Sequence, residues 1–231
     1  MKRLITKIYE NRLFVLYLLL IIVSYHIISN FFQKNLLGSI GILGDAELYY
    51  CGATKYKLGL NPYDLAYCNG ETTMRYQYSI IALLFFYILS FLDLEIYKII
   101  WLIVEILSFF IIIKYTFKIF NLKKNFFNIF LVLFGFGGVC WSGFLSGNIS
   151  IILYAIISVS IYELCKKNIY NFCLLIIIIS FFKPYLLLFI ILGFGIYKKK
   201  FLKYFIFTTV IILTLHYTSY LLEPEYFKNY L

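Results

Sequence analysis

The sequence predicts an all-α integral membrane protein, a single domain over residues 1–231 with about seven to nine membrane helices. The first observation is composition: 63% of the 231 residues are hydrophobic and 14% are charged, whereas average soluble domains carry about 25% charged residues. The second is that the apolar residues form long runs, and the third is that short lysine clusters separate these runs. Such clusters are typical of the cytoplasmic ends of membrane helices.

The net charge of +10 does not indicate a nucleic-acid partner, because the lysines lie beside apolar runs rather than on one face of a soluble domain. The 25 Phe and 23 Tyr suit the interfacial belts and the helix packing of a protein in lipid. We therefore expect membrane lipids around the chain and no binding of nucleic acid.

The N-terminal segment predicts an uncleaved signal-anchor. A cluster of lysines and arginines precedes an apolar run over residues 13–30. At about 1.5 Å per residue, that run suffices for a hydrocarbon core of roughly 30 Å, and no small-residue cleavage site follows it. The positive flank places the N-terminus in the cytoplasm and residues 31–75 in a loop on the non-cytoplasmic side.

This predicted loop contains a segment compatible with a helix. Asp45 is able to open the segment as an N-cap, and Gly59 is able to close it as a C′ residue. Helical spacing places Asp45 and Tyr49 on one face, and residues 60–63 (LNPY) read as a turn. We expect a short helix that lies along the membrane surface.

Further apolar segments follow, at about 76–92, 96–117, 126–143, 147–164, 170–197 and 201–222. The segment 170–197 is unusual because Lys183-Pro184 stands at its middle. As one helix it would measure roughly 42 Å. The alternatives are a pair of short helices or a re-entrant hairpin, broken at the lysine.

The charge rule and the helix count conflict. All lysine clusters from Lys114 onward fall in the cytoplasm only if 170–197 makes two short passes. The segment 96–117 must then run inward, although counting from the N-terminus makes it run outward. Either one pass between residues 31 and 97 is miscounted, or one basic loop breaks the charge rule.

Asp45 and Glu47 form an acid-x-acid pair beside the membrane surface. A carboxylate there could act as a general base toward a hydroxyl group. The competing interpretation of Asp45 is an ordinary N-cap. Glu47 faces elsewhere on a helix, as a solvated side chain or as a contact to the substrate.

Lys183 is the second candidate, because a lysine inside an apolar run costs about 2.5–3.5 kcal/mol on insertion scales and such residues usually mark a site. Its ammonium could bind a phosphate as a point charge. The alternative is a lysine at a helix end that extends to the interface.

Three further residues are candidates for substrate contacts. Arg75 and Tyr76 stand where the polar loop re-enters the membrane, as ligands of a lipid headgroup or as interfacial anchors. Asn148 lies in residues 143–150 (GFLSGNIS), which form either a plain tight turn or a place where the amide binds a sugar hydroxyl.

The five cysteines are scattered and make no CxxC and no metal-ligand spacing. Cys51 and Cys68 share the polar loop, so a disulfide is possible in an oxidising compartment. The simpler expectation, which we favour, is that all are free thiols that pack as small hydrophobes. No GxGxxG, Walker, HExxH or zinc pattern is present, so we expect neither a nucleotide nor a metal.

Several short motifs follow one another along the chain: Asp45, Tyr49-Tyr50, Ala53, Leu58-Gly59, Asn61-Pro62-Tyr63, Arg75-Tyr76, Trp101, Gly147-Asn148 and Lys183-Pro184. Their order resembles that of the polyprenyl-phosphate-mannose-dependent mannosyltransferases of glycosyltransferase family 87, within the GT-C superfamily. The resemblance covers roughly residues 10–205. It departs from the family pattern in a missing proline after Tyr76-Gln77, in the changed amide positions of Gly147-Asn148-Ile149-Ser150, and in a chain end where family members continue.

The resemblance implies a GT-C-like helical bundle in the cell membrane that moves a hexose, with mannose expected first, from a polyprenyl-phosphate sugar to a glycolipid or glycan acceptor. The reaction would occur on the non-cytoplasmic side with inversion and without a cofactor. Asp45 matches the family's general base and Lys183 its Lys-Pro lysine. The remaining substrate-binding candidates are Arg75, Tyr49, Tyr76, Asn148 and Glu47.

Two other functions are consistent with the sequence. One is a non-catalytic membrane subunit or a degenerate fragment of such an enzyme, as the early end of the chain would allow. The other is a lipid-sugar flippase or permease in which Lys183 lines a path. Few charges lie within the apolar segments, which argues against a transport path.

Overall fold

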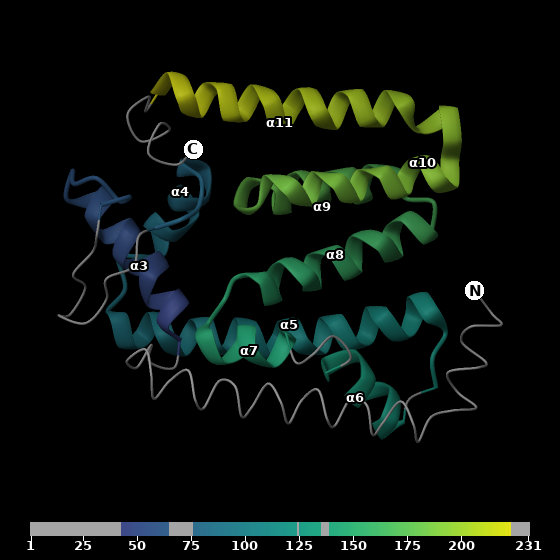
Figure 1. Ribbon diagram of the computed structural model, residues 1–231, viewed down its shortest axis with the longest axis horizontal. Helices are drawn as coiled ribbons and strands as arrows, with labels where there is room; N and C mark the ends of the chain where they lie inside the picture. The colour runs from purple at the N-terminus through teal and green to yellow at the C-terminus, as the bar shows by residue number, and fades with distance from the viewer. Residues whose placement is uncertain (1–42, 65–75, 124, 135–138, 223–231) are drawn as a thin grey trace.

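The structure is a computed structural model that describes residues 43–64, 76–123, 125–134 and 139–222. Every regular element within these ranges is a helix, as Figure 1 shows. The prediction of an all-α chain is therefore confirmed for the described residues. The predicted first membrane helix lies outside the described residues, as do residues 31–42 and 65–75 of the predicted loop, which include Cys68 and Arg75.

The first described helix, α3 (Gly44–Lys57), ends as the sequence predicts. Gly59 adopts a φ of +71°, a left-handed conformation that glycine reaches without a steric penalty. Its N–H donates to the carbonyl of Tyr56 at 3.0 Å, and the N–H of Leu60 donates to that of Lys55 at 2.9 Å. This pair of bonds is a Schellman motif, which satisfies the last carbonyls of the helix.

The start of α3 differs from the N-cap interpretation of Asp45. Leu43 occupies the N-cap position, and no side chain makes a capping hydrogen bond there. Asp45 therefore lies within the first turn and is free for other partners. The turn after the helix forms as predicted, because the Asn61 side chain accepts a hydrogen bond of 3.0 Å from the N–H of Tyr63.

Cys51 of α3 is disulfide-bonded. The expectation that every cysteine is a free thiol is therefore wrong for this residue, although it holds for Cys165 and Cys173. Spacing in the sequence alone could not decide the pairing of Cys51.

Two helices of very different length follow the loop. Helix α4 (Ile80–Leu89) has 10 residues and measures about 15 Å, half of a hydrocarbon core. Helix α5 (Leu94–Phe120) has 27 residues. Within the described residues it is the one helix long and apolar enough to cross a membrane. The apolar segment 76–92, counted above as a membrane helix, therefore forms a helix too short for a straight crossing.

The next predicted segment, 126–143, forms two short pieces, α6 (Phe126–Phe134) and α7 (Val139–Ser146). Helix α8 (Ser150–Cys165) follows and packs along α5. The bend between α7 and α8 brings residues 146–150 against the start of α3.

The long segment 170–197 is broken where the sequence predicts a break. Helix α9 (Ile169–Phe182) ends at Lys183, whose backbone is extended, and Pro184 opens the 3₁₀ helix η1 (Pro184–Ile190). Proline has no N–H to continue the helix, and it disfavours helical backbone at the residue before it.

The chain then reverses direction. Helix α10 (Ile191–Tyr197) ends near the C-terminal end of α8, because the Tyr197 hydroxyl donates to the carbonyl of Leu164 at 3.0 Å. Phe201, after α10, packs on Phe172 near the start of α9, with ring centroids 6.1 Å apart. The segment is thus a hairpin with Lys183 at its tip, and α11 (Leu202–Leu222) packs on α9 (Figure 1).

The two ends of the bundle differ in charge. Helices α5, α8 and α10 all end on the right of Figure 1, and the lysine clusters lie there. Lys118 and Lys166 approach the ring of Tyr162 from two helices, at 5.1 and 4.7 Å from its centroid. The tip of the α9–α10 hairpin, α3 and the start of α8 lie at the opposite end.

Candidate functional site

Asp45 is held by the bend that joins α7 to α8. Its Oδ2 accepts hydrogen bonds from the Ser146 hydroxyl at 3.0 Å and from the Asn148 amide at 2.7 Å. The carboxylate stands in the first turn of α3, where the helix dipole stabilises negative charge. No other polar contact of Asp45 occurs among the described residues, so Oδ1 is left for a further partner.

Asn148 links Asp45 to Lys183 through Ser150. The Lys183 ammonium donates to the Ser150 hydroxyl at 2.6 Å, and that hydroxyl lies 2.6 Å from the Asn148 side-chain oxygen, to which it donates. The other end of the same amide donates to Asp45. A cation and an anion that are far apart in sequence therefore end one continuous chain of hydrogen bonds, which we call the Asp45–Lys183 chain.

Gly147 makes the close approach of α3 to the bend possible. Its φ is +73°, and a Cβ at this position would lie 2.9 Å from Cβ of Ala46 and 3.0 Å from Cα of Leu43. Its carbonyl accepts a hydrogen bond of 2.9 Å from the indole of Trp101. Both the backbone conformation and the space at this position require glycine.

Replacing Gly147 by alanine should separate Asp45 from Asn148. The new methyl group collides with α3 and the backbone is strained, so we expect a destabilisation of about 1–3 kcal/mol and loss of most activity. Thermal unfolding in detergent, together with a transfer assay, measures both. Gly195→Ala is the matched control, because a Cβ there meets nothing within 4 Å; equal effects of the two changes would contradict the close approach.

A layer of buried tyrosines supports the Asp45–Lys183 chain from the interior. Tyr49 is 1% exposed; its hydroxyl accepts from the N–H of Ile149 at 3.3 Å and shares a hydrogen bond of 3.1 Å with Tyr78. Burial raises the pKa of Tyr49, so its hydroxyl stays protonated at neutral pH. Tyr78 also lies under Lys183, with the ammonium 5.9 Å from the ring centroid.

The other predicted site residues that the structure describes are not members of this chain of hydrogen bonds. Tyr76 is 2% exposed and packs its ring against Gly52. Because Tyr76 and Tyr49 are both buried, they are suited to support the site rather than to contact a substrate directly. Glu47 forms an ion pair with Lys98 of α5. Arg75 lies outside the described residues.

Ser146 and Ser150 are members of the site that the sequence pattern does not predict. The signal was present, since both serines flank Asn148 in the polar interval 143–150. Serine is common in tight turns and at helix starts, so neither hydroxyl stood out until the fold placed it between charged groups.

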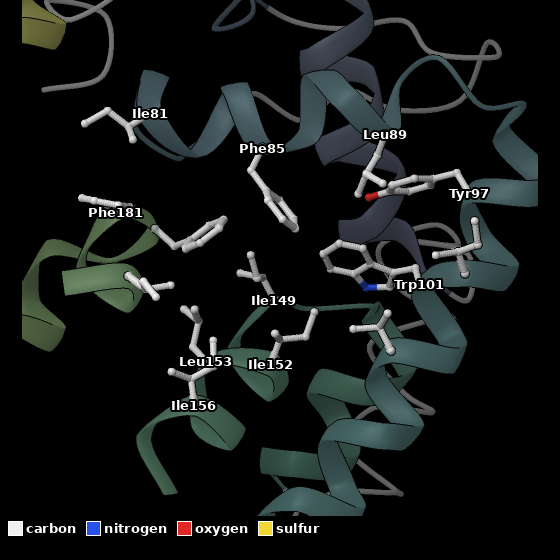
Figure 2. A pocket seen from close by; sticks show the side chains of 14 residues that line it. Ile81, Phe85, Leu89, Tyr97, Trp101, Ile149, Ile152, Leu153, Ile156 and Phe181 are labelled. Atoms are coloured by element: carbon white, nitrogen blue, oxygen red, sulfur yellow. The ribbon is translucent and has the colours of Figure 1, made fainter. Parts of the chain in front are cut away.

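An apolar cavity of about 370 Å³ adjoins the site, lined by residues of α4, α5, α8 and α9 and by Ile149 (Figure 2). Ile149 and Phe182 line it, and each is the immediate neighbour of a member of the Asp45–Lys183 chain, Asn148 and Lys183. The volume is at the lower end of the range for small-molecule pockets. A lipid could thus place its apolar chain in the cavity and its polar headgroup at the Asp45–Lys183 chain.

The arrangement suits transfer chemistry on a charged, partly apolar substrate. A carboxylate with one oxygen fixed by two donors is oriented to accept a proton on the other. A fixed ammonium can compensate charge on a phosphate. No group of three His, Cys, Asp or Glu that could hold a metal occurs in the described part of the chain.

Comparison with known proteins identifies the family. Residues 76–231, more than half of the chain, match the family model of glycosyltransferase family 87. The match contains Asn148, Ser150 and Lys183, whereas Asp45 precedes it. No curated protein and no solved structure matches the chain. The extent of the match shows that the chain belongs to glycosyltransferase family 87, a family of the GT-C superfamily.

Proposed function

We propose that this glycosyltransferase moves a hexose, with mannose as the first candidate, from a polyprenyl-phosphate donor to the hydroxyl of a glycolipid or glycan acceptor. The observation that carries the proposal is the Asp45–Lys183 chain, in which hydrogen bonds connect a base to a cation. Family membership supplies the reaction class.

Asp45 acts as the general base in this proposal. Its Oδ2 is occupied by Ser146 and Asn148, so Oδ1 takes the proton of the acceptor hydroxyl. The acceptor oxygen forms the new bond to the anomeric carbon while the bond from that carbon to the phosphate oxygen breaks. The polyprenyl phosphate leaves with the electron pair, and attack from the opposite face inverts the configuration.

Lys183 stabilises the leaving phosphate. Charge builds up on the phosphate oxygens as the sugar departs, and a preorganised cation lowers the energy of that state. The hydrogen bond to Ser150 holds the ammonium in place before the donor binds. The apolar cavity beside it is consistent with substrates that carry lipid chains.

The site end of the bundle faces the non-cytoplasmic side in this proposal. Two independent features support this orientation: the lysine clusters gather at the opposite end, as cytoplasmic ends do, and Cys51 near Asp45 is disulfide-bonded, as in oxidising compartments. A short α4 that does not cross the membrane removes one pass before α5. The earlier conflict between helix count and charge rule then disappears.

Labelling with a membrane-impermeant maleimide tests the orientation. Cys165 is free and exposed at the basic end, so we expect intact cells to protect it and permeabilised cells to expose it. A cysteine introduced at Leu60, which is 54% exposed, should react without permeabilisation. Cys165→Ser identifies the band that belongs to Cys165, and the reverse pattern of reactivity would contradict the orientation.

The transferase reaction itself is tested with purified protein and a polyprenyl-phosphate hexose labelled in the sugar. Labelled glycolipid should accumulate when acceptor lipids extracted from the host membrane are supplied. Movement of the intact labelled donor across a proteoliposome membrane, without a glycosylated product, would favour the flippase instead.

A further inference from the structure

The apolar cavity contains one polar group that no part of the described chain satisfies. Tyr97 of α5 is 1% exposed and lines the cavity, and its hydroxyl has no hydrogen-bond partner among the described residues. Figure 2 shows this hydroxyl directed into the cavity, between Leu89 and Trp101. Buried hydroxyls in proteins nearly always have a partner, so an unpaired one in a cavity points to a ligand.

The hydroxyl is fixed in this position by its neighbours. Tyr97 and Trp101 stand one helical turn apart on the buried face of α5, with ring centroids 5.7 Å apart. Tyr50 of α3 packs on Tyr97 at 5.2 Å and is itself held by a hydrogen bond from its hydroxyl to the carbonyl of Leu92. The Tyr97 ring therefore cannot swing its hydroxyl out to water.

We propose that the cavity binds the ester-linked acyl chain of the acceptor lipid and that Tyr97 donates a hydrogen bond to the ester carbonyl. The apolar walls suit a hydrocarbon chain, and the single donor needs an acceptor atom on that chain. A polyprenyl chain is hydrocarbon throughout and has no such atom, which assigns the cavity to the acceptor rather than to the donor. Only this last assignment rests on the proposed function.

The position of the cavity agrees with this assignment. Ile149 and Phe182 connect its wall to Asn148 and Lys183, so a lipid whose chain lies in the cavity presents its headgroup to the Asp45–Lys183 chain. The acceptor hydroxyl belongs to such a headgroup.

Fluorescence quenching of Trp101 tests the proposal directly. Trp101 lines the cavity and is one of two tryptophans, so a Trp141→Phe background makes it the sole reporter. The probes are phosphatidylglycerols with brominated chains, one ester-linked and one ether-linked, titrated into the detergent-solubilised full chain. We expect the ester lipid to quench with an apparent affinity about fivefold to tenfold higher, since only it offers the carbonyl.

Tyr97→Phe should abolish this preference, because the apparent affinity for the ester lipid should fall to that for the ether lipid. Tyr154→Phe is the matched control, because Tyr154 of α8 does not line the cavity and is 38% exposed, and it should keep the preference. Ile152→Phe places a larger side chain in the cavity and should lower the apparent affinity for both lipids. Equal affinities of the two lipids for the parent protein, as expected if water occupies the cavity, or a preference retained by Tyr97→Phe, would overturn the proposal.

The binding measurement is separate from catalysis. Asp45→Asn should leave the preference for the ester lipid over the ether lipid unchanged, because that preference depends on Tyr97 and not on the headgroup. A protein that binds the ester lipid selectively but transfers no sugar would retain the cavity assignment as a lipid site and refute the transferase mechanism instead.

Discussion

Replacing Asp45 by asparagine is expected to reduce sugar transfer by a factor of at least about 100, since general bases contribute typically 10²–10⁴-fold. Asparagine preserves the size of the side chain and can still accept from Ser146 and Asn148, but it cannot take the acceptor proton. Initial rates with labelled donor at saturating acceptor measure the effect, and affinity for the donor should change little.

Asp93→Asn is the control for this experiment, because Asp93 is an exposed residue at the N-cap of α5 whose side chain makes no capping bond. Both variants should express and insert equally, and only the Asp45 variant should lose activity. Full activity of Asp45→Asn would remove this residue from the mechanism and leave the general base to be found elsewhere.

Replacing Lys183 by methionine is expected to lower kcat/KM for the donor by about 100-fold or more. The change removes a charge-assisted contact to a phosphate whose charge grows in the transition state, an effect of about 2.7–4 kcal/mol where comparable groups have been removed. Methionine keeps an unbranched, apolar side chain, so the tip of the α9–α10 hairpin should still fold. Steady-state kinetics with varied donor provides the measurement.

Two comparisons show whether this loss concerns the phosphate. Lys183→Arg keeps the charge and should recover part of the activity, although the guanidinium cannot reproduce the contact to Ser150 at the same length. Lys98→Met removes another partly buried lysine, one paired with Glu47, and should cost little activity. A Lys183→Met enzyme with normal kinetics would assign Lys183 to structure alone.

The parts of the fold that the sequence predicts correctly depend on local chemistry. Gly59 ends α3 because only glycine readily adopts its positive φ, and Lys183-Pro184 breaks the late segment because proline cannot continue a helix. Helix lengths were not predictable in this way. Apolar composition alone does not distinguish a long span such as α5 from the short helices α4, α6 and α7.

The candidate site was predictable in its two charged residues and its amide, and not in the connections between them. Asp45, Asn148 and Lys183 are conspicuous because each is costly or unusual in an apolar chain. Ser150, which joins two of them, is an ordinary residue at a helix start. The choice between an N-cap and a tertiary acceptor for Asp45 depended on the α7–α8 bend, which lies about a hundred residues away in sequence.

A double-mutant cycle between Asp45→Glu and Lys183→Arg tests most directly whether these two residues belong to one site. Each change keeps its charge, so measurable activity should remain in both single variants and in the double variant. We predict that kcat/KM of the double variant differs at least about fivefold from the value expected from independent effects, because members of one hydrogen-bond network couple. A kcat/KM of the double variant within about a factor of two of the value expected from independent effects would contradict the connected site.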